Sequence, residues 1–127
     1  MPRNRFVVAE SVRYELSDGD WVEFKKRLNY GEVKRLTTSG LNLVGDMGNN
    51  PRYDLSIERF EENKRVIWLS AWSFANGKGR LMEITADNVG ALEPETVAEI
   101  DLALAKHMGA MEDEKNARAP DTAPAAG

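Results

Sequence analysis

Alternating apolar and polar residues near the start of the chain predict a β-hairpin. Apolar side chains occupy every second position in Val12–Leu16, and they do so more loosely in Trp21–Lys25. Residues 17–20, between these two segments, read Ser-Asp-Gly-Asp, and an Asp-Gly pair supplies the left-handed backbone that a tight turn requires. We therefore predict two antiparallel strands joined by this turn, with residues 6–9 as a candidate third strand.

A first helix is predicted over Tyr30–Val44. Asn29 and Glu32 stand at the positions of a capping box, which satisfies free N–H groups at the start of a helix. Apolar residues then recur at helical spacing, at Tyr30, Val33, Leu36 and Leu43. Residues 37–40, Thr-Thr-Ser-Gly, have low helix propensity, so this helix can end early. Residues 45–51 are rich in Gly, Asn and Asp, which predicts a loop.

A second and longer helix is predicted from Pro51 until Asn76-Gly77 ends it, with Asn50 as its N-cap. Its first half mixes charged with apolar residues, as expected for a helix with one solvent-facing side. From Val66 to Ala75 it is apolar almost all round, which predicts packing on more than one side.

The remaining elements are a short extended segment over Leu81–Ile84, a brief helix that begins at a Thr85 cap, and a long helix that starts at Pro94. Apolar residues of this last helix recur at intervals of three and four, at Val97, Ile100, Leu104, Met108 and Met111.

Together these elements predict an α+β, mostly α fold, in which an N-terminal β-hairpin packs on about four helices. We expect residues 1–115 to form a single globular domain, since the chain has the length of one domain. Residues 116–127 consist mainly of Ala, Pro, Asp, Thr and Gly. Such a segment buries too little apolar surface to offset its ordering entropy, so we expect a disordered, flexible C-terminal tail.

Composition narrows the classes of function. The net charge of −4, with acidic and basic residues interspersed, argues against a nucleic-acid-binding protein, which normally carries a basic stripe. The absence of cysteine excludes disulfides and thiolate metal sites. No apolar run approaches the roughly 20 residues that cross a bilayer, and no signal peptide is evident. We therefore expect an intracellular protein that does not bind membranes.

Candidate catalytic chemistry is sparse. His107 is the only histidine, and no Gly-x-Ser-x-Gly elbow or Glu-x-x-His pair accompanies it. We interpret His107 as a packing or surface residue. The Asp-Gly-Asp at 18–20 lacks the remaining ligands of a calcium loop, and the Gly-Lys-Gly at 77–79 lacks the rest of a phosphate-binding motif. We expect no catalytic residues, no metal and no cofactor, and hence no enzyme.

Basic residues gather at 25–27 and at 34–35, close to the aromatic residues Trp21, Phe24 and Tyr30. Basic side chains interleaved with aromatic ones can bind single-stranded nucleic acid. We favour the simpler interpretation that solvated Lys and Arg side chains lie over aromatic residues of the core.

Trp68 and Trp72 lie one turn apart in the predicted second helix, and two interpretations stay open for them. They are either core residues or part of an oligomer or partner interface, where tryptophan is enriched. Met108 and Met111 add adaptable apolar surface on the last helix. The candidate partner-binding residues are therefore Trp68, Trp72, Met108 and Met111.

Several segments, taken in order, resemble one family of proteins. They are Asp18–Lys25, Leu28–Glu32, Val66–Phe74 with the Asn76–Gly79 turn, and Leu92–Asp101. The family is that of the tail assembly chaperones of long-tailed, siphovirus-like bacteriophages and their prophage relatives. None of these segments is a catalytic signature.

The resemblance implies a function without chemistry. Such a chaperone binds the tape-measure protein, keeps it soluble during tail assembly in the host cell cytoplasm, and is absent from the finished virion. The resemblance also implies low-order homo-oligomers, tail-tube subunits as a second partner, and a longer frameshifted form of the protein. The alternative from the same setting is a virion structural protein, such as a head–tail connector or tail terminator.

Overall fold

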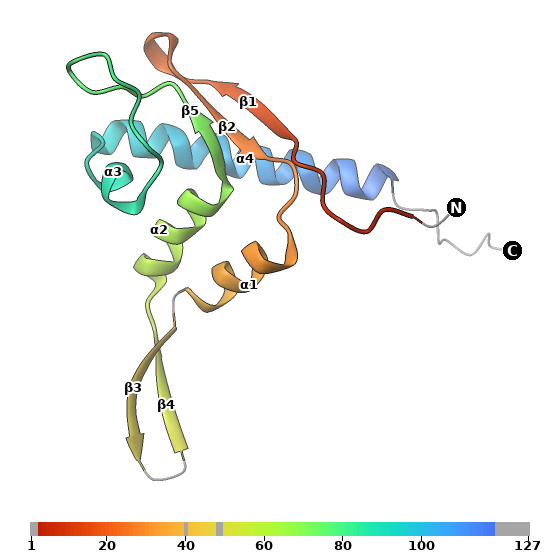
Figure 1. Ribbon diagram of the computed structural model, residues 1–127, viewed down its shortest axis with the longest axis vertical. Coiled ribbons are helices and arrows are strands. Elements are labelled where there is room, and N and C mark those ends of the chain that lie inside the picture. Colours follow the sequence, from red (N-terminus) through yellow and green to blue (C-terminus); the bar gives the residue numbers. More distant parts are fainter. Residues whose placement is uncertain (1–2, 40, 48–49, 119–127) are drawn as a thin grey trace, which may run out of the picture.

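The computed structural model describes residues 3–39, 41–47 and 50–118 of the 127-residue chain. It has an α+β fold in which a long helix lies across a small antiparallel sheet (Figure 1). The elements follow in the order β1 (Ser11–Glu15), a 3₁₀ turn (Ser17–Gly19), β2 (Trp21–Lys25), α1 (Tyr30–Thr38), β3 (Leu41–Met47), β4 (Asn50–Leu55), α2 (Ile57–Trp68), β5 (Leu69–Trp72), α3 (Ala86–Gly90) and α4 (Pro94–Arg118).

The predicted N-terminal hairpin is confirmed. Strands β1 and β2 pair antiparallel, with Tyr14 opposite Val22, and the turn places Asp18 and Gly19 at φ angles of 58° and 79°. The prediction of a third strand at residues 6–9 is wrong, because the third strand of the sheet is β5 and the order is β1-β2-β5. Phe6 and Val8 of that N-terminal segment are 86% and 61% exposed, so this segment contributes little to the core that the sheet helps to form.

The predicted long helix is wrong at both ends. Helix α2 begins at Ile57, where the Ser56 side chain accepts a hydrogen bond from Arg59 N (3.2 Å), and it ends at Trp68. The chain then continues as β5, whose register shifts against β2 between Glu23 and Phe24. This irregularity leaves both ends of the strand, Leu69 and Trp72, buried. An apolar run rich in tryptophan suits a buried strand as well as a helix, so periodicity could not distinguish them.

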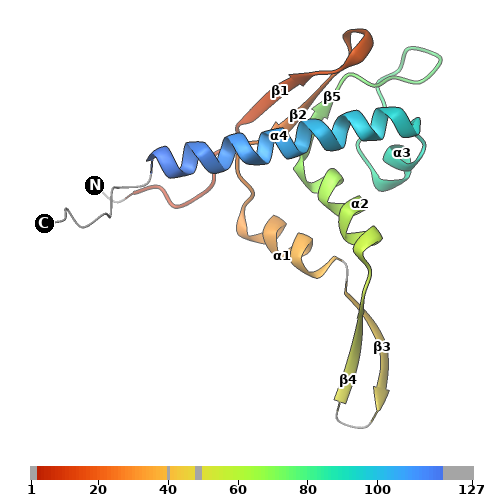
Figure 2. The same cartoon turned by 180° about the vertical axis from the view of Figure 1, so that it is seen from behind.

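The predicted first helix and the following loop also differ from the structure. Helix α1 ends at Thr38, as the low helix propensity of residues 37–40 allowed. Strands β3 and β4 then form a two-stranded antiparallel sheet, where the sequence predicted the end of one helix, a loop and the start of the next helix. Pro51, expected as the first residue of a helix, pairs with Asp46 in this hairpin. The two views show the β3–β4 hairpin projecting away from the rest of the molecule (Figures 1 and 2).

The last two helices agree with prediction. Thr85 caps α3 by accepting a hydrogen bond from Asn88 N (3.0 Å), and α4 starts at Pro94. Helix α4 continues to Arg118, three residues into the segment expected to be a flexible tail. The rest of that segment, 119–127, lies outside the described residues.

The core lies between α4 and the inner face of the three-stranded sheet. Its buried residues are Val22, Phe24, Leu69, Trp72, Val89, Ile100, Leu104 and His107. Within the described ranges, no helix is long and apolar enough to cross a membrane.

Candidate partner-binding surfaces

His107 anchors α4 to the sheet. Its ring is fully buried, and its Nε2 lies 2.7 Å from the Lys25 carbonyl oxygen. Because a carbonyl can only accept, Nε2 carries the proton and Nδ1 accepts from the Tyr14 hydroxyl at 2.8 Å. Burial lowers the pKa of His107 below its ordinary value, although the hydrogen bond to Lys25 opposes this shift. The interpretation of His107 as a packing residue is confirmed.

Trp68 belongs to the aromatic cluster around His107. Its ring meets the imidazole edge-on at a centroid distance of 5.8 Å, while Phe24 stacks on the same imidazole at 5.4 Å. The Trp68 side chain is half-buried, and its buried Nε1 has no hydrogen-bond partner in the part of the chain that the structure describes. Much of the Trp68 side chain therefore packs in the interior of the protein.

Trp72 is a core residue, which decides between the two interpretations that the sequence left open for it. Only 2% of its surface is exposed, and its Nε1 donates a hydrogen bond to the Met82 carbonyl at 2.7 Å. It lies on β5 and not on a helix, so the expected helical-turn spacing from Trp68 is wrong.

The two candidate methionines lie on the C-terminal half of α4. Met108 is 37% exposed, and Met111 is half-buried. The structure does not bring Met108, Met111, Trp68 and Trp72 together in one surface, because the side chain of Trp72, in strand β5, is buried in the core. Leu102, also on α4, is 74% exposed and was not among the candidates.

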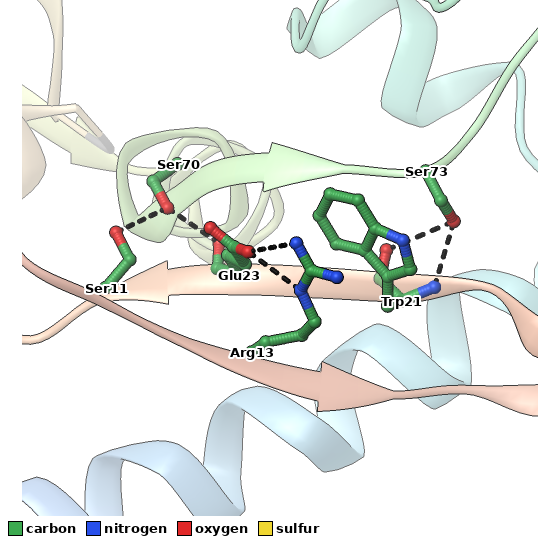
Figure 3. Close-up of polar contacts among 6 residues, drawn as sticks. All are labelled: Ser11, Arg13, Trp21, Glu23, Ser70 and Ser73. Atoms are coloured by element: carbon green, nitrogen blue, oxygen red, sulfur yellow. Dashed lines mark hydrogen bonds and ion pairs between the residues drawn. The ribbon is translucent and has the colours of Figure 1, made fainter.

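The outer face of the sheet carries a linked set of polar side chains (Figure 3). The Arg13 guanidinium stacks 3.7 Å from the centre of the Trp21 ring, and its Nε donates to Glu23 at 2.8 Å. Ser70 donates to the Glu23 carbonyl (3.2 Å), so Ser11 is the donor in the 2.7 Å hydroxyl pair that joins Ser11 to Ser70. These contacts fix the outer side of all three strands.

The turn of the hairpin is tied to β5 and to α4. Ser73 Oγ accepts from Trp21 N at 2.9 Å (Figure 3). The same hydroxyl donates to Asp20 at 2.8 Å. On the other side of the turn, the backbone N–H and hydroxyl of Ser17 donate to Glu99 at 2.8 and 2.9 Å. Residues 17–21 therefore position the hairpin against two elements that are distant in the sequence.

A bidentate ion pair joins α2 to α4. Arg65 Nε and Nη2 donate to the two carboxylate oxygens of Asp101 at 2.7 and 2.9 Å. The hydrogen bond to Asp101 raises the pKa of the Arg65 guanidinium above its usual value. Asp101 lies at the end of the Leu92–Asp101 segment, and its pair with Arg65 orients α4 against α2.

Helix α1 presents an apolar surface to solvent. Tyr30 is 79% exposed and Val33 is 46% exposed, whereas the sequence assigned both to an apolar stripe. The expected capping box between Asn29 and Glu32 is present, with hydrogen bonds of 2.8 and 2.9 Å. Burial would raise the pKa of Glu32, but hydrogen bonds from Lys25 and from the Asn29 backbone lower it below its ordinary value.

A second apolar surface lies along β5. It is a hollow of about 520 Å³ lined mainly by Trp21, Val66, Leu69, Leu81, Met82 and Ile84. Glu83 is the one charged residue of its lining. Such a hollow is large enough for a few side chains, but its lining does not define the charge of an occupant.

Among the described residues, no three His, Asp or Glu side chains are grouped closely enough to hold a metal ion. Comparison of the chain with protein-family models, with curated proteins and with solved structures found no match.

Proposed function

We propose that this protein is a tail assembly chaperone of a long-tailed bacteriophage. It binds the tape-measure protein in the host cell cytoplasm and keeps it soluble until the tail forms, and it acts by binding alone. The order of the resembling segments supports this proposal. Their structural roles, in the hairpin turn, in the α1 cap and in the ion pair that Asp101 forms with Arg65, are compatible with one shared scaffold.

The observation that carries the proposal is the exposure of large apolar side chains on helical surfaces. They are Tyr30 and Val33 on α1 and Leu102 and Met108 on α4. A long helical protein awaiting assembly has apolar stripes that must be covered, and helices are covered by apolar surfaces with anchors at helical spacing. A single exposed apolar residue is ordinary on any protein, but Tyr30 and Val33 lie three residues apart on one short helix.

Co-expression tests the proposal. The full chain is produced together with the longest helical protein encoded beside its gene, and the soluble fraction is assayed for both proteins. We expect the long protein to become soluble and to co-purify with this chain. No rescue, together with detection of this chain in purified phage particles, would instead favour a head–tail connector or a tail terminator.

Self-association is part of the proposal and has a direct test. Light scattering coupled to size-exclusion chromatography gives the mass of the particle in solution. We expect a small multiple of the 14.2 kDa chain mass. Pull-down with the tail-tube subunit tests the second partner in the same way.

A further inference from the structure

We propose that the exposed face of α1 is the docking surface for an acidic amphipathic helix of the partner. This face consists of Tyr30, Val33, Lys34 and Thr37, which stand at positions i, i+3, i+4 and i+7 and therefore share one side of the helix. All four are exposed. The inference deepens the proposed function, and it rests on that function only for the identity of the partner.

Helix α1 is held in place although it adds nothing to the buried core. None of its nine residues is buried, and a helix of this length is not stable alone in water. It is held by its capping box, by the Lys25–Glu32 ion pair and by packing beside α2 (Figure 2). Its outer face is thus presented in a fixed conformation before any partner arrives, which lowers the entropic cost of binding.

The charge around α1 is opposite to that of the whole chain. Residues 25–39 contain five basic residues and a single acidic one, Glu32, whereas the chain has a net charge of −4. Lys25 pairs with Glu32 and Lys26 pairs with Glu10. The three other basic residues, Arg27, Lys34 and Arg35, have no salt bridge within the described ranges and are exposed. An acidic partner would complement them.

The shape of the surface favours a helix as the occupant. Two apolar anchors three residues apart match the spacing with which an amphipathic helix places its own apolar residues. Single-stranded nucleic acid would also be attracted by the basic side chains, but it needs several aromatic platforms for its bases. Tyr30 is the sole aromatic residue on this face, and Val33 and Thr37 offer no stacking surface.

Peptide binding to the full-length protein tests the inference. The probe is a fluorescein-labelled synthetic helix with Leu at the a and d positions and Glu on the remaining surface, and the matched control peptide carries Lys in place of Glu. We expect the acidic peptide to bind, more weakly as salt is raised, and the basic peptide not to bind, as measured by fluorescence anisotropy. Tyr30→Ser/Val33→Ser and Lys34→Glu/Arg35→Glu should each weaken binding at least about tenfold.

A matched control variant is Phe6→Ser, which removes a similarly exposed aromatic residue (86% exposed) from the N-terminal segment and should leave binding unchanged. All substituted positions are exposed, so thermal melting should show each variant folded. If the α1 variants bind the acidic peptide with the affinity of the unsubstituted protein, or if the unsubstituted protein does not bind it at all, the inference is overturned. Tighter binding of a single-stranded oligonucleotide with the same dependence on Lys34 and Arg35 would replace it with a nucleic-acid site.

Co-expression of the same variants separates this inference from the proposed function. If the α1 variants still solubilise the long helical protein, the chaperone function holds and the α1 site is wrong. If the unsubstituted chain fails to solubilise that protein but binds the acidic peptide through α1, the site holds and the chaperone function is wrong.

Discussion

Replacing Trp72 by Ala should destabilise the protein more than any substitution on its surface. The side chain is the bulkiest of the buried hydrophobic residues, and its removal costs about 3–5 kcal/mol through lost burial and the cavity left behind. The variant also loses the hydrogen bond from Nε1 to the Met82 carbonyl, which adds about 1 kcal/mol. The free energy of unfolding of a chain of this size is on the order of 10 kcal/mol, so the loss would be a large fraction of it.

Urea denaturation followed by far-ultraviolet circular dichroism measures this loss as the change in unfolding free energy. The matched control is Trp21→Ala, because Trp21 is half-buried on the outer face of the sheet and stacks under Arg13. We expect Trp21→Ala to lower the free energy of unfolding by about 1 kcal/mol, because it removes an exposed cation–π contact and some packing. A Trp72→Ala variant that loses less than about 1 kcal/mol, or that changes the mass of the particle in solution without losing stability, would show that this ring lies at an interface.

Three further measurements examine single contacts. Burial lowers the pKa of His107 in the folded protein, so between that lowered pKa and the ordinary value of 6.5 the unfolded chain binds more protons than the folded one. The free energy of unfolding should therefore fall as the pH drops from above 6.5 toward the folded pKa. His107→Gln should flatten this dependence of the unfolding free energy on pH, as measured by urea titrations at several pH values. A slope that His107→Gln leaves unchanged would assign the effect to other groups. Asp101→Asn should cost only about 1 kcal/mol in the same assay, because the Asp101 side chain is 43% exposed and solvent screens its pair with Arg65; a loss several times larger would contradict this. Asn29→Ala removes the α1 cap and should cost about 1 kcal/mol, with weaker binding of the acidic peptide as α1 frays; unchanged binding would mean that the cap does not preorganise the surface.

Local chemistry predicted the elements whose ends are determined by a few neighbouring residues. The Asp-Gly turn, the Asn29 cap, the Thr85 cap and Pro94 at the start of α4 all lie where the sequence predicted them. Each depends on hydrogen bonds or backbone angles within one turn of chain. Such signals do not require knowledge of the rest of the fold.

Strands β3, β4 and β5 could not be predicted in the same way, because distant pairing decides them. Residues Leu69–Trp72 are extended because β2 provides backbone hydrogen-bonding partners for a strand, and because the extended conformation buries both Leu69 and Trp72. The same residues taken alone satisfy a helical pattern equally well. In the β3–β4 hairpin, Pro51 looked like a helix start because its pairing with Asp46 is not visible in the local sequence.

The role of His107 was only half predictable. The sequence indicated a packing histidine, but its two hydrogen-bond partners, Tyr14 and Lys25, are 93 and 82 residues away along the chain. The exposure of Tyr30 and Val33 was missed for a different reason. Helical spacing shows that two apolar residues share a face, but it does not show whether another element covers that face.

The buried core and the exposed face of α1 are separate parts of this chain. The buried residues join the three-stranded sheet, α3 and α4, and none of them comes from α1. Selection for a stable core alone would not require two exposed apolar residues on a capped helix, nor the exposed basic residues Arg27, Lys34 and Arg35 on and beside it, which have no salt bridge among the described residues. If that surface exists for a partner, Tyr30→Ser/Val33→Ser should weaken binding at least about tenfold. It should leave the unfolding free energy within about 0.5 kcal/mol of the unsubstituted protein, as surface substitutions usually do. A loss of stability as large as that of a core variant would show instead that α1 supports the fold and that its exposed face is incidental.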